Sequence, residues 1–244
     1  MAGAALQGRL TWQLAEVTEA RSETAHVRTL VLDAPDWIGH RAGQHLDVRL
    51  TAEDGYQAQR SYSIGSPPGE PPAITIERLE DGEVSPYLVD VVRPGDRFEI
   101  RGPIGGYFVW EPGQGGPLLL LAGGSGIVPL MAMIRHHARE GSDVPVRLLY
   151  SARTIDDVIY RDELARIDGV DVVLTLTRAQ PPGWTGYARR VDGEMLREVA
   201  WPPADEPLVY VCGATGFAEA TSQTLVELGY PPQRIRIERF GATG

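Results

Sequence analysis

The chain has 244 residues, with 23 basic residues against 33 acidic ones, which gives a formal net charge of −10 at pH 7. Every basic residue is an arginine and no basic run is longer than Arg189-Arg190, so the sequence lacks the positive surface that binds nucleic acid. Apolar runs such as Leu118 to Ala122 are far shorter than the roughly 20 residues that a bilayer requires. The single cysteine, Cys212, excludes an intrachain disulfide and a four-cysteine iron–sulfur cluster. The histidines show no metal-ligand spacing. We therefore expect a cytoplasmic protein that contacts neither nucleic acid nor membrane and holds no metal.

The first part of the chain is rich in short β segments bounded by turns. Leu46, Val48 and Leu50 alternate with polar residues, which is typical of a strand with one buried face. The predicted strands are Leu10 to Thr18, Val27 to Asp33, His45 to Leu50, Gln57 to Ile64, Ala73 to Leu79 and Arg97 to Ile100. Six such strands predict a small antiparallel Greek-key β-barrel.

A Gly- and Pro-rich segment from Glu111 to Pro117 reads as a linker, and the pattern changes after it. A helix is expected from Ile127 to Gly141, and another from Thr215, as N-cap, to Gly229. The predicted strands are Leu118 to Ala122, Val146 to Ser151, Val170 to Arg178, Leu208 to Gly213 and Arg234 to Phe240. Strands that alternate with helices predict a doubly wound parallel sheet. We expect a barrel domain at residues 1–112 and a nucleotide-binding domain at residues 113–244.

The first strand of the second domain runs directly into a glycine-rich turn and then a helix. Gly124, Ser125 and Gly126 lie in a G-x-G-x-x-P spacing that ends at Pro129. Glycines allow close approach to a phosphate, and free N–H groups at a helix start stabilise its charge. The turn therefore predicts a dinucleotide cradle, although such turns also join strands to helices in proteins without nucleotides.

The next strand of the second domain ends at Tyr150-Ser151-Ala152-Arg153, with no carboxylate at its tip. A site for a ribose 2′-hydroxyl favours Asp or Glu there, whereas an arginine favours a 2′-phosphate. This choice indicates NADP(H) over NAD(H).

Two features of the barrel domain predict a second phosphate site. The Arg60-Ser61-Tyr62-Ser63 segment ends a predicted strand with a cation, an aromatic ring and two hydroxyls, which together suit a diphosphate and a flat heterocycle. In Gly82 to Pro86, Ser85 is expected to cap a short helix whose amides could hold an anion. An exposed polar strand end and an ordinary capped helix are the alternatives.

Two phosphate sites, one in each domain, predict two nucleotide cofactors that meet across a domain cleft. The order of five motifs resembles the ferredoxin–NADP reductase superfamily. These motifs are Arg60-Ser61-Tyr62-Ser63, Gly82 to Ser85, Gly124 to Pro129, Cys212-Gly213 and Glu238-Arg239-Phe240.

The resemblance implies the roles of individual residues. Arg60 would bind the flavin pyrophosphate, Tyr62 would stack on the isoalloxazine ring and Ser63 would face the reactive flavin nitrogen. The cofactor-binding residues expected for the flavin are Arg60, Ser61, Tyr62, Ser63, Ile76, Gly82, Val84, Ser85 and Phe240; those expected for the pyridine nucleotide are Gly124, Ser125, Gly126, Arg153, Arg161, Thr177, Arg178, Cys212 and Gly213. Thr177-Arg178 occupies the place of a Ser-Arg pair in family members that use NADP(H).

The same resemblance implies a catalytic group of Ser63, Cys212, Glu238 and Phe240. Cys212 would lie beside the nicotinamide, and Phe240 would cover the flavin face that the nicotinamide must reach. Phe240 stands where plant-type enzymes have Tyr, and four residues follow it.

The expected activity is hydride transfer from NADPH to bound FAD, followed by single-electron transfer to a separate ferredoxin or iron-containing oxygenase. One alternative is a diaphorase or flavin reductase that acts on diffusible acceptors, and another is a non-catalytic flavin-binding relay or sensor subunit. FAD is favoured over FMN by the resemblance, with Tyr56 as the only candidate to receive the adenine.

Overall fold

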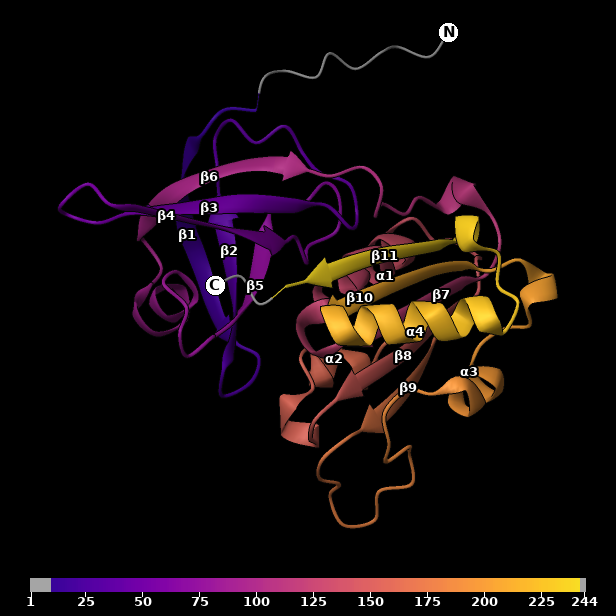
Figure 1. Ribbon diagram of the computed structural model, residues 1–244. Helices are drawn as coiled ribbons and strands as arrows, with labels where there is room; N and C mark the ends of the chain where they lie inside the picture. The colour runs from indigo at the N-terminus through magenta and orange to yellow at the C-terminus, as the bar shows by residue number, and fades with distance from the viewer. Residues whose placement is uncertain (1–9, 242–244) are drawn as a thin grey trace, which may run out of the picture.

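A computed structural model describes residues 10–241 and contains two sheets that lie side by side (Figure 1). The first is a curled six-stranded antiparallel sheet in the order β4-β3-β6-β1-β2-β5. Its strands are β1 (Gln13–Ser22), β2 (Val27–Asp33), β3 (His45–Thr51), β4 (Gln57–Ser63), β5 (Ala73–Glu77) and β6 (Arg97–Ile104). The two edge strands meet where Ile64 pairs with Ile74, so the sheet forms a half-barrel.

The concave face of this sheet forms its own core. Leu46 and Val48 of β3 are fully buried, as the alternating pattern predicts, and they pack with Leu30, Ile74 and Ile100 from other strands. The first strand begins later and ends later than expected, because a bulge between Val17 and Glu19 carries the pairing with β2 on to Ser22.

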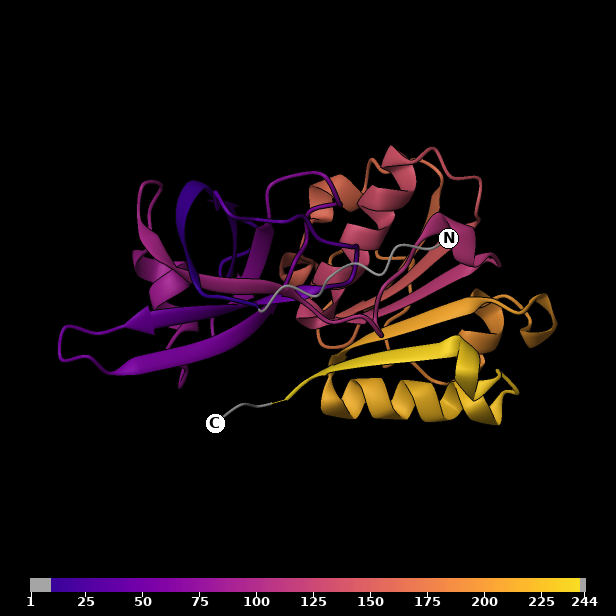
Figure 2. The ribbon, with the colours of Figure 1, turned by 90° about the horizontal axis from the view of Figure 1, so that it is seen from above.

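The second sheet has five strands in the order β11-β10-β7-β8-β9, and all its pairings are parallel. Its strands are β7 (Leu118–Gly123), β8 (Val146–Ala152), β9 (Val170–Leu176), β10 (Leu208–Ala214) and β11 (Ile235–Phe240). The helices are α1 (Ile127–Arg139), α2 (Arg161–Leu164), α3 (Gly193–Val199) and α4 (Thr215–Glu227). Viewed from above, α1 and α4 lie on opposite sides of the sheet (Figure 2). This is the doubly wound arrangement that the alternating pattern predicts, and the fold class is confirmed.

Short helical turns connect the strands. They are the π-helical turn η1 (Tyr87–Val91) and the 3-10 turns η2 (Pro112–Gln114), η3 (Gly124–Gly126), η4 (Ile155–Asp157), η5 (Pro203–Asp205) and η6 (Pro232–Arg234).

Two predicted helix caps are wrong. Thr215 is the first residue of α4, and Ala214 takes the N-cap position with no side-chain hydrogen bond. The Ser85 hydroxyl accepts a hydrogen bond from the Leu79 backbone N–H at 3.1 Å, and η1 has no side-chain cap. Ser85 therefore closes the turn that leaves β5 and does not cap the following helix.

Within residues 10–241, no helix combines the length and the apolar character that crossing a membrane requires.

Candidate functional site

Strand β4 places two of the predicted flavin-binding side chains, Arg60 and Tyr62, on the concave face of the half-barrel. Arg60 and Tyr62 pair across the strands with Val48 and Leu46, whose side chains belong to the barrel core. Tyr62 packs partly against that core, and burial raises the pKa of its phenol. A cation and an aromatic ring therefore stand on one face of the same strand.

Ser61 faces the other way, because side chains alternate along a strand. Its hydroxyl donates to Asp47 Oδ1 at 2.6 Å. Asp47 is buried and also accepts from Gln59 at 3.0 Å and from Arg101 at 2.6 Å. The structure therefore places the Ser61 side chain in a polar cluster on the convex face, apart from Arg60 and Tyr62.

Ser63 ends β4 with a hydroxyl that lacks a partner. The residue is buried, and Ser63 Oγ has no hydrogen bond to any atom of residues 10–241. A buried polar atom without a partner is costly, so a site of this kind suits a ligand that supplies one. The orphaned hydroxyl is compatible with a flavin polar atom at this position.

The segment from Gly82 to Ser85 returns to Arg60. Glu83 Oε2 lies 3.4 Å from the Arg60 guanidinium, and Glu83 Oε1 accepts a hydrogen bond from the Tyr56 hydroxyl at 3.1 Å. A Cβ on Gly82 would lie 2.8 Å from Ser85 Oγ, so this turn requires the glycine. The Glu83 carboxylate thus occupies the anion-binding position beside Arg60, and sequence reasoning missed it although it stands inside the motif.

Two of the expected flavin-binding residues are core residues. Val84 is 1% exposed and Ile76 is fully buried, and both pack inside the half-barrel. Their buried side chains support the strand and turn that carry the site. Only their backbone atoms are therefore available to contact a ligand.

The second candidate ligand site is the turn η3 between β7 and α1. The two candidate sites, this one and the one at the end of β4, are called seats below. Gly124 has a φ of +56°, which a side chain rarely adopts, and a Cβ on Gly126 would lie 2.1 Å from the carbonyl oxygen of Cys212. Strands β7 and β10 are neighbours whose connections leave in opposite directions, which marks the point where ligands bind in doubly wound sheets. The turn is therefore an open backbone cradle at the expected position.

Phe217, at the start of α4, covers this cradle from one side. A Cβ on Gly123 would lie 2.7 Å from Phe217 Cδ1, and one on Gly213 would lie 2.8 Å from the same atom. The ring explains why both positions are glycine. Sequence reasoning missed Phe217, and the aromatic that follows Gly213-Ala214-Thr215-Gly216 was the available signal.

Cys212 and Glu238 are cross-strand neighbours near the carboxyl ends of β10 and β11. Cys212 is fully buried, and burial together with the Glu238 charge raises the pKa of its thiol. Burial also raises the pKa of Glu238 to about 7. Phe240 follows on β11 and is partly buried. The site therefore presents a neutral thiol, a carboxyl that titrates near neutral pH and an aromatic ring.

The expected 2′-phosphate residues lie just beyond β8 and β9. The Arg178 backbone N–H donates to the Arg153 carbonyl at 2.9 Å, and the Thr177 hydroxyl donates to the Ala152 carbonyl at 3.2 Å. Arg153 and Arg178 are exposed, and neither forms an ion pair within residues 10–241. Arg161 differs, because its guanidinium lies 3.3 Å from Asp156 and 3.8 Å from Asp162.

The two seats converge at the junction of the sheets. Just after Ser63, a Cβ on Gly65 would lie 3.3 Å from Val128 Cγ1 on the first turn of α1. At another point, a Cβ on Gly43 would lie 2.7 Å from Met133 Cε of the same helix. The end of β4 and the first turn of α1 are thus packed against each other.

Both halves of the chain match known families. Residues 12–109 match the Oxidoreductase FAD-binding domain and residues 120–223 match the Oxidoreductase NAD-binding domain. The chain is 32% identical over 238 residues to Ferredoxin–NADP reductase B of Sorangium cellulosum, which covers 93% of this chain and 96% of that protein.

Two further similarities concern larger and modular proteins. The chain is 33% identical over 232 residues to the glycine betaine monooxygenase reductase subunit of Chromohalobacter salexigens, covering 91% of this chain and 62% of that protein. A solved structure, the flavohem-like FAD/NAD binding domain of nitric oxide dioxygenase from Vibrio cholerae, superimposes with a TM-score of 0.85 at 25% identity and covers 94% of this chain and 98% of that one. This chain therefore spans less than two thirds of the monooxygenase reductase.

An FAD-binding domain followed by an NAD-binding domain defines an NAD(P)H-dependent FAD oxidoreductase. The chain belongs to the ferredoxin–NADP reductase superfamily, so the family predicted from the sequence is confirmed.

Proposed function

We propose that this chain is an NADPH-dependent reductase that receives a hydride on FAD and passes single electrons to a separate ferredoxin or oxygenase component. The observation that carries the proposal is the close packing of Gly65, just after β4, against the first turn of α1, where a Cβ on Gly65 would lie 3.3 Å from Val128 Cγ1. Hydride transfer requires two rings in contact, and seats on two domains serve that reaction only where the domains meet in this way.

On the barrel side, we assign Arg60 to the flavin diphosphate, Tyr62 to the flavin ring and Ser63 to a polar atom of the ring edge. Arg60 must first exchange the Glu83 carboxylate for phosphate, and the long 3.4 Å separation of that exposed pair makes the exchange inexpensive. The flavin, when bound, supplies the conversion of a two-electron donor into two one-electron steps.

On the other side, η3 holds the diphosphate of the pyridine nucleotide through its free N–H groups. The Cys212 thiol is neutral and lies beneath the position assigned to the nicotinamide. The Glu238 carboxyl lies beside this thiol and can accept or release a proton near neutral pH. Phe240 would cover the flavin face and would have to move aside for the nicotinamide to enter.

The preference for NADPH rests on Arg153 and Arg178. In a chain of net charge −10, most arginines of residues 10–241 hold a carboxylate or a carbonyl, whereas the guanidinium groups of Arg153 and Arg178, whose backbones are hydrogen-bonded to each other, hold neither. A 2′-phosphate is the part of NADPH that would neutralise them, since arginine binds phosphate through charged hydrogen bonds.

The acceptor is proposed to be a separate protein, because one cysteine cannot ligate a four-cysteine cluster within this chain. The similar proteins named as a ferredoxin–NADP reductase and as a monooxygenase reductase subunit support an acceptor of this type.

The test is anaerobic mixing of the purified yellow protein with NADPH or with NADH, followed by addition of a ferredoxin. NADPH should bleach the flavin absorbance rapidly, NADH more slowly, and ferredoxin should restore it. A protein that binds no flavin contradicts the proposal, equal rates with both nucleotides contradict the NADPH preference, and reoxidation by quinones alone indicates a diaphorase.

A further inference from the structure

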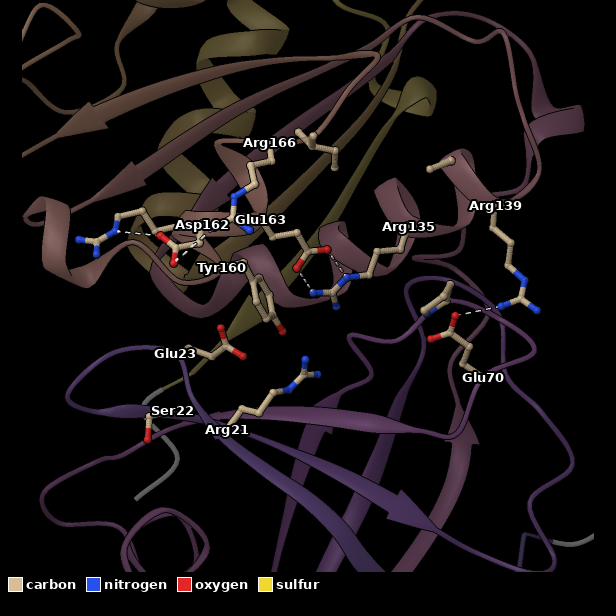
Figure 3. Close-up of a pocket in the computed structure, with 14 residues that line it drawn as sticks. Arg21, Ser22, Glu23, Glu70, Arg135, Arg139, Tyr160, Asp162, Glu163 and Arg166 are labelled. Carbon is tan, nitrogen blue, oxygen red and sulfur yellow. Dashed lines mark hydrogen bonds and ion pairs between the residues drawn. The ribbon is translucent and has the colours of Figure 1, made fainter.

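A cleft of about 820 Å³ lies between the half-barrel and the parallel-sheet domain, and Tyr160 borders it (Figure 3). Its lining comes from the β1–β2 turn at Arg21 and Glu23 and from helices α1 and α2 of the other domain. Of the predicted site residues, Arg161 lines it. Guanidinium and carboxylate groups of the lining pair with one another, as Arg135 does with Glu163 at 2.5 Å, so the cleft carries little free charge for a ligand.

Tyr160 crosses this junction from the second domain. Its side chain is 4% exposed, and its hydroxyl lies 2.5 Å from Thr75 Oγ1 on strand β5 of the half-barrel. Its backbone has a φ of +59°, a conformation that an aromatic residue rarely adopts. The chain accepts this strained conformation where the ring points toward the barrel (Figure 3).

The hydroxyl of Tyr160 begins a buried hydrogen-bond chain. Thr75 Oγ1 lies 2.7 Å from Thr29 Oγ1, and the Thr29 hydroxyl donates to Glu23 Oε1 at 2.7 Å. Since a carboxylate only accepts and each hydroxyl has one proton, Thr75 must donate to Thr29 and Tyr160 must donate to Thr75. The chain therefore runs in one direction from Tyr160 to Glu23, and every hydroxyl in it is satisfied.

Arg135 on α1 adds a second link at the same place. Its guanidinium stands 4.5 Å from the centre of the Tyr160 ring and donates to the Gly65 carbonyl at 2.5 Å. A Cβ on Gly65 would lie 2.9 Å from the Tyr160 hydroxyl, so the glycine is needed for the ring to enter. The two links thus hold the segment that follows Ser63 and strand β5, which carries Thr75.

We propose that Tyr160 is a positioning residue for hydride transfer: with Arg135, it clamps strand β5 and the segment that follows β4 to the parallel-sheet domain and so sets the spacing between the Ser63 and Cys212 sites. The inference rests on the proposed function, because the spacing matters only if a hydride passes between the two seats. Misplacing the reacting groups by about 1 Å can slow a reaction about 100-fold, so loosening the clamp slows transfer more than it weakens binding.

The test compares Tyr160→Phe with Tyr230→Phe. Tyr230 is also 4% exposed, and its hydroxyl donates to the Trp201 carbonyl inside the second domain, so both variants lose one buried hydroxyl but only Tyr160→Phe loses a link between domains. The rate of flavin reduction at saturating NADPH should fall about five- to tenfold in Tyr160→Phe, with flavin content unchanged and NADPH affinity within about twofold. Tyr230→Phe should keep the wild-type rate while losing similar thermal stability.

Thr75→Val supplies a second variant from the barrel side. It leaves the Tyr160 hydroxyl buried without a partner, so it should be less stable than Tyr160→Phe, and the double variant should be more stable than Thr75→Val alone. A wild-type reduction rate in Tyr160→Phe, or an equal slowing in Tyr230→Phe, overturns the positioning role.

Amide hydrogen exchange separates this proposal from the proposed function, because it needs no turnover. Tyr160→Phe should increase exchange at residues 64–66 and 73–76, and Tyr230→Phe should not. A wild-type protein that neither NADPH nor NADH reduces refutes the proposed function. Unchanged exchange in Tyr160→Phe refutes the clamp itself.

Discussion

The two proposed phosphate sites of this protein depend on different groups, one on side chains and the other on the backbone. The seat on the half-barrel depends on side chains, with the Arg60 guanidinium held by Glu83 at 3.4 Å. The seat at η3 depends on the backbone, where Gly126 lies so close to the Cys212 carbonyl that no Cβ fits. A site built from side chains is weakened when one charged side chain is removed. A site built from backbone is disrupted when a glycine in it gains a methyl group. The difference predicts which substitutions separate flavin binding from nucleotide binding.

The largest effect is expected for Gly126→Ala. The added Cβ would lie 2.1 Å from the Cys212 carbonyl oxygen, so the loop must shift and the cradle with it. NADP⁺ affinity, measured by difference spectroscopy, should fall about 100-fold, with flavin still bound. Gly113→Ala is the control, because a Cβ there meets no atom within 4 Å and should change nothing. Unaltered NADP⁺ affinity in Gly126→Ala would show that the backbone of η3 is not the diphosphate seat.

The second effect concerns Arg60. Arg60→Ala removes a charged hydrogen-bond donor worth about 2 kcal/mol, so FAD affinity should fall about 30-fold while NADP⁺ affinity stays the same. The measurement is the ratio of flavin to protein absorbance after gel filtration. Arg49→Ala is a matched control, since that arginine also pairs with a carboxylate on the barrel, Glu99.

Glu83→Gln is a second test of the side-chain site at Arg60. It removes the carboxylate that occupies the position beside Arg60, so FAD should bind at least as tightly as to the wild-type protein. Weaker binding in Glu83→Gln would mean that Glu83 supports the flavin instead of standing in its place.

The third effect is on nucleotide preference. Arg178→Ala should weaken NADPH binding about tenfold, the loss of about 1.5 kcal/mol expected for one charged hydrogen bond, and should leave NADH binding unchanged. Arg197→Ala, an exposed arginine on α3, is the control. An equal loss for both nucleotides would place Arg178 against a part that they share.

The smallest effect is a pH dependence of stability. Burial raises the pKa of Glu238 from an ordinary 4.5 to about 7. The folded protein then keeps a proton that the unfolded chain releases, so this contribution to stability is complete below pH 4.5 and is lost as the pH rises through 7. Relative to Glu238→Gln, the wild-type free energy of unfolding should fall by about 1–2 kcal/mol between pH 5 and pH 8 in urea titrations. Parallel pH profiles would contradict the raised pKa, and Glu227→Gln controls for loss of a surface carboxylate.

The strands and the η3 turn could be predicted because their signals are local. Alternation in Leu46 and Val48 gives the face of β3, and the run from Leu118 into Gly124 gives the strand, turn and helix. The roles of Ser61 and Ser85 could not be predicted in the same way. A hydroxyl can hydrogen-bond to many different groups, and only the fold decides which of them it meets. Ser61 meets the buried Asp47, and Ser85 meets the Leu79 N–H.

Contacts between residues far apart in the chain also could not be predicted from the sequence. Thr75 and Tyr160 are 85 residues apart, and neither belongs to a motif. Their pairing depends on how the two sheets dock, which no periodicity encodes. Gly65, which leaves room for the Tyr160 ring, is a sequence feature consistent with this pairing. A glycine after a strand is, however, equally typical of an ordinary turn.

The central claim is that the two seats bring a nicotinamide and a flavin into direct contact. Its most direct test is stopped-flow flavin reduction with NADPH deuterated on one or the other face of the nicotinamide C4 position, at saturating concentration. The account predicts a primary isotope effect for one face and none for the other. Reduction without an isotope effect from either face, or no reduction of the bound flavin, would contradict it.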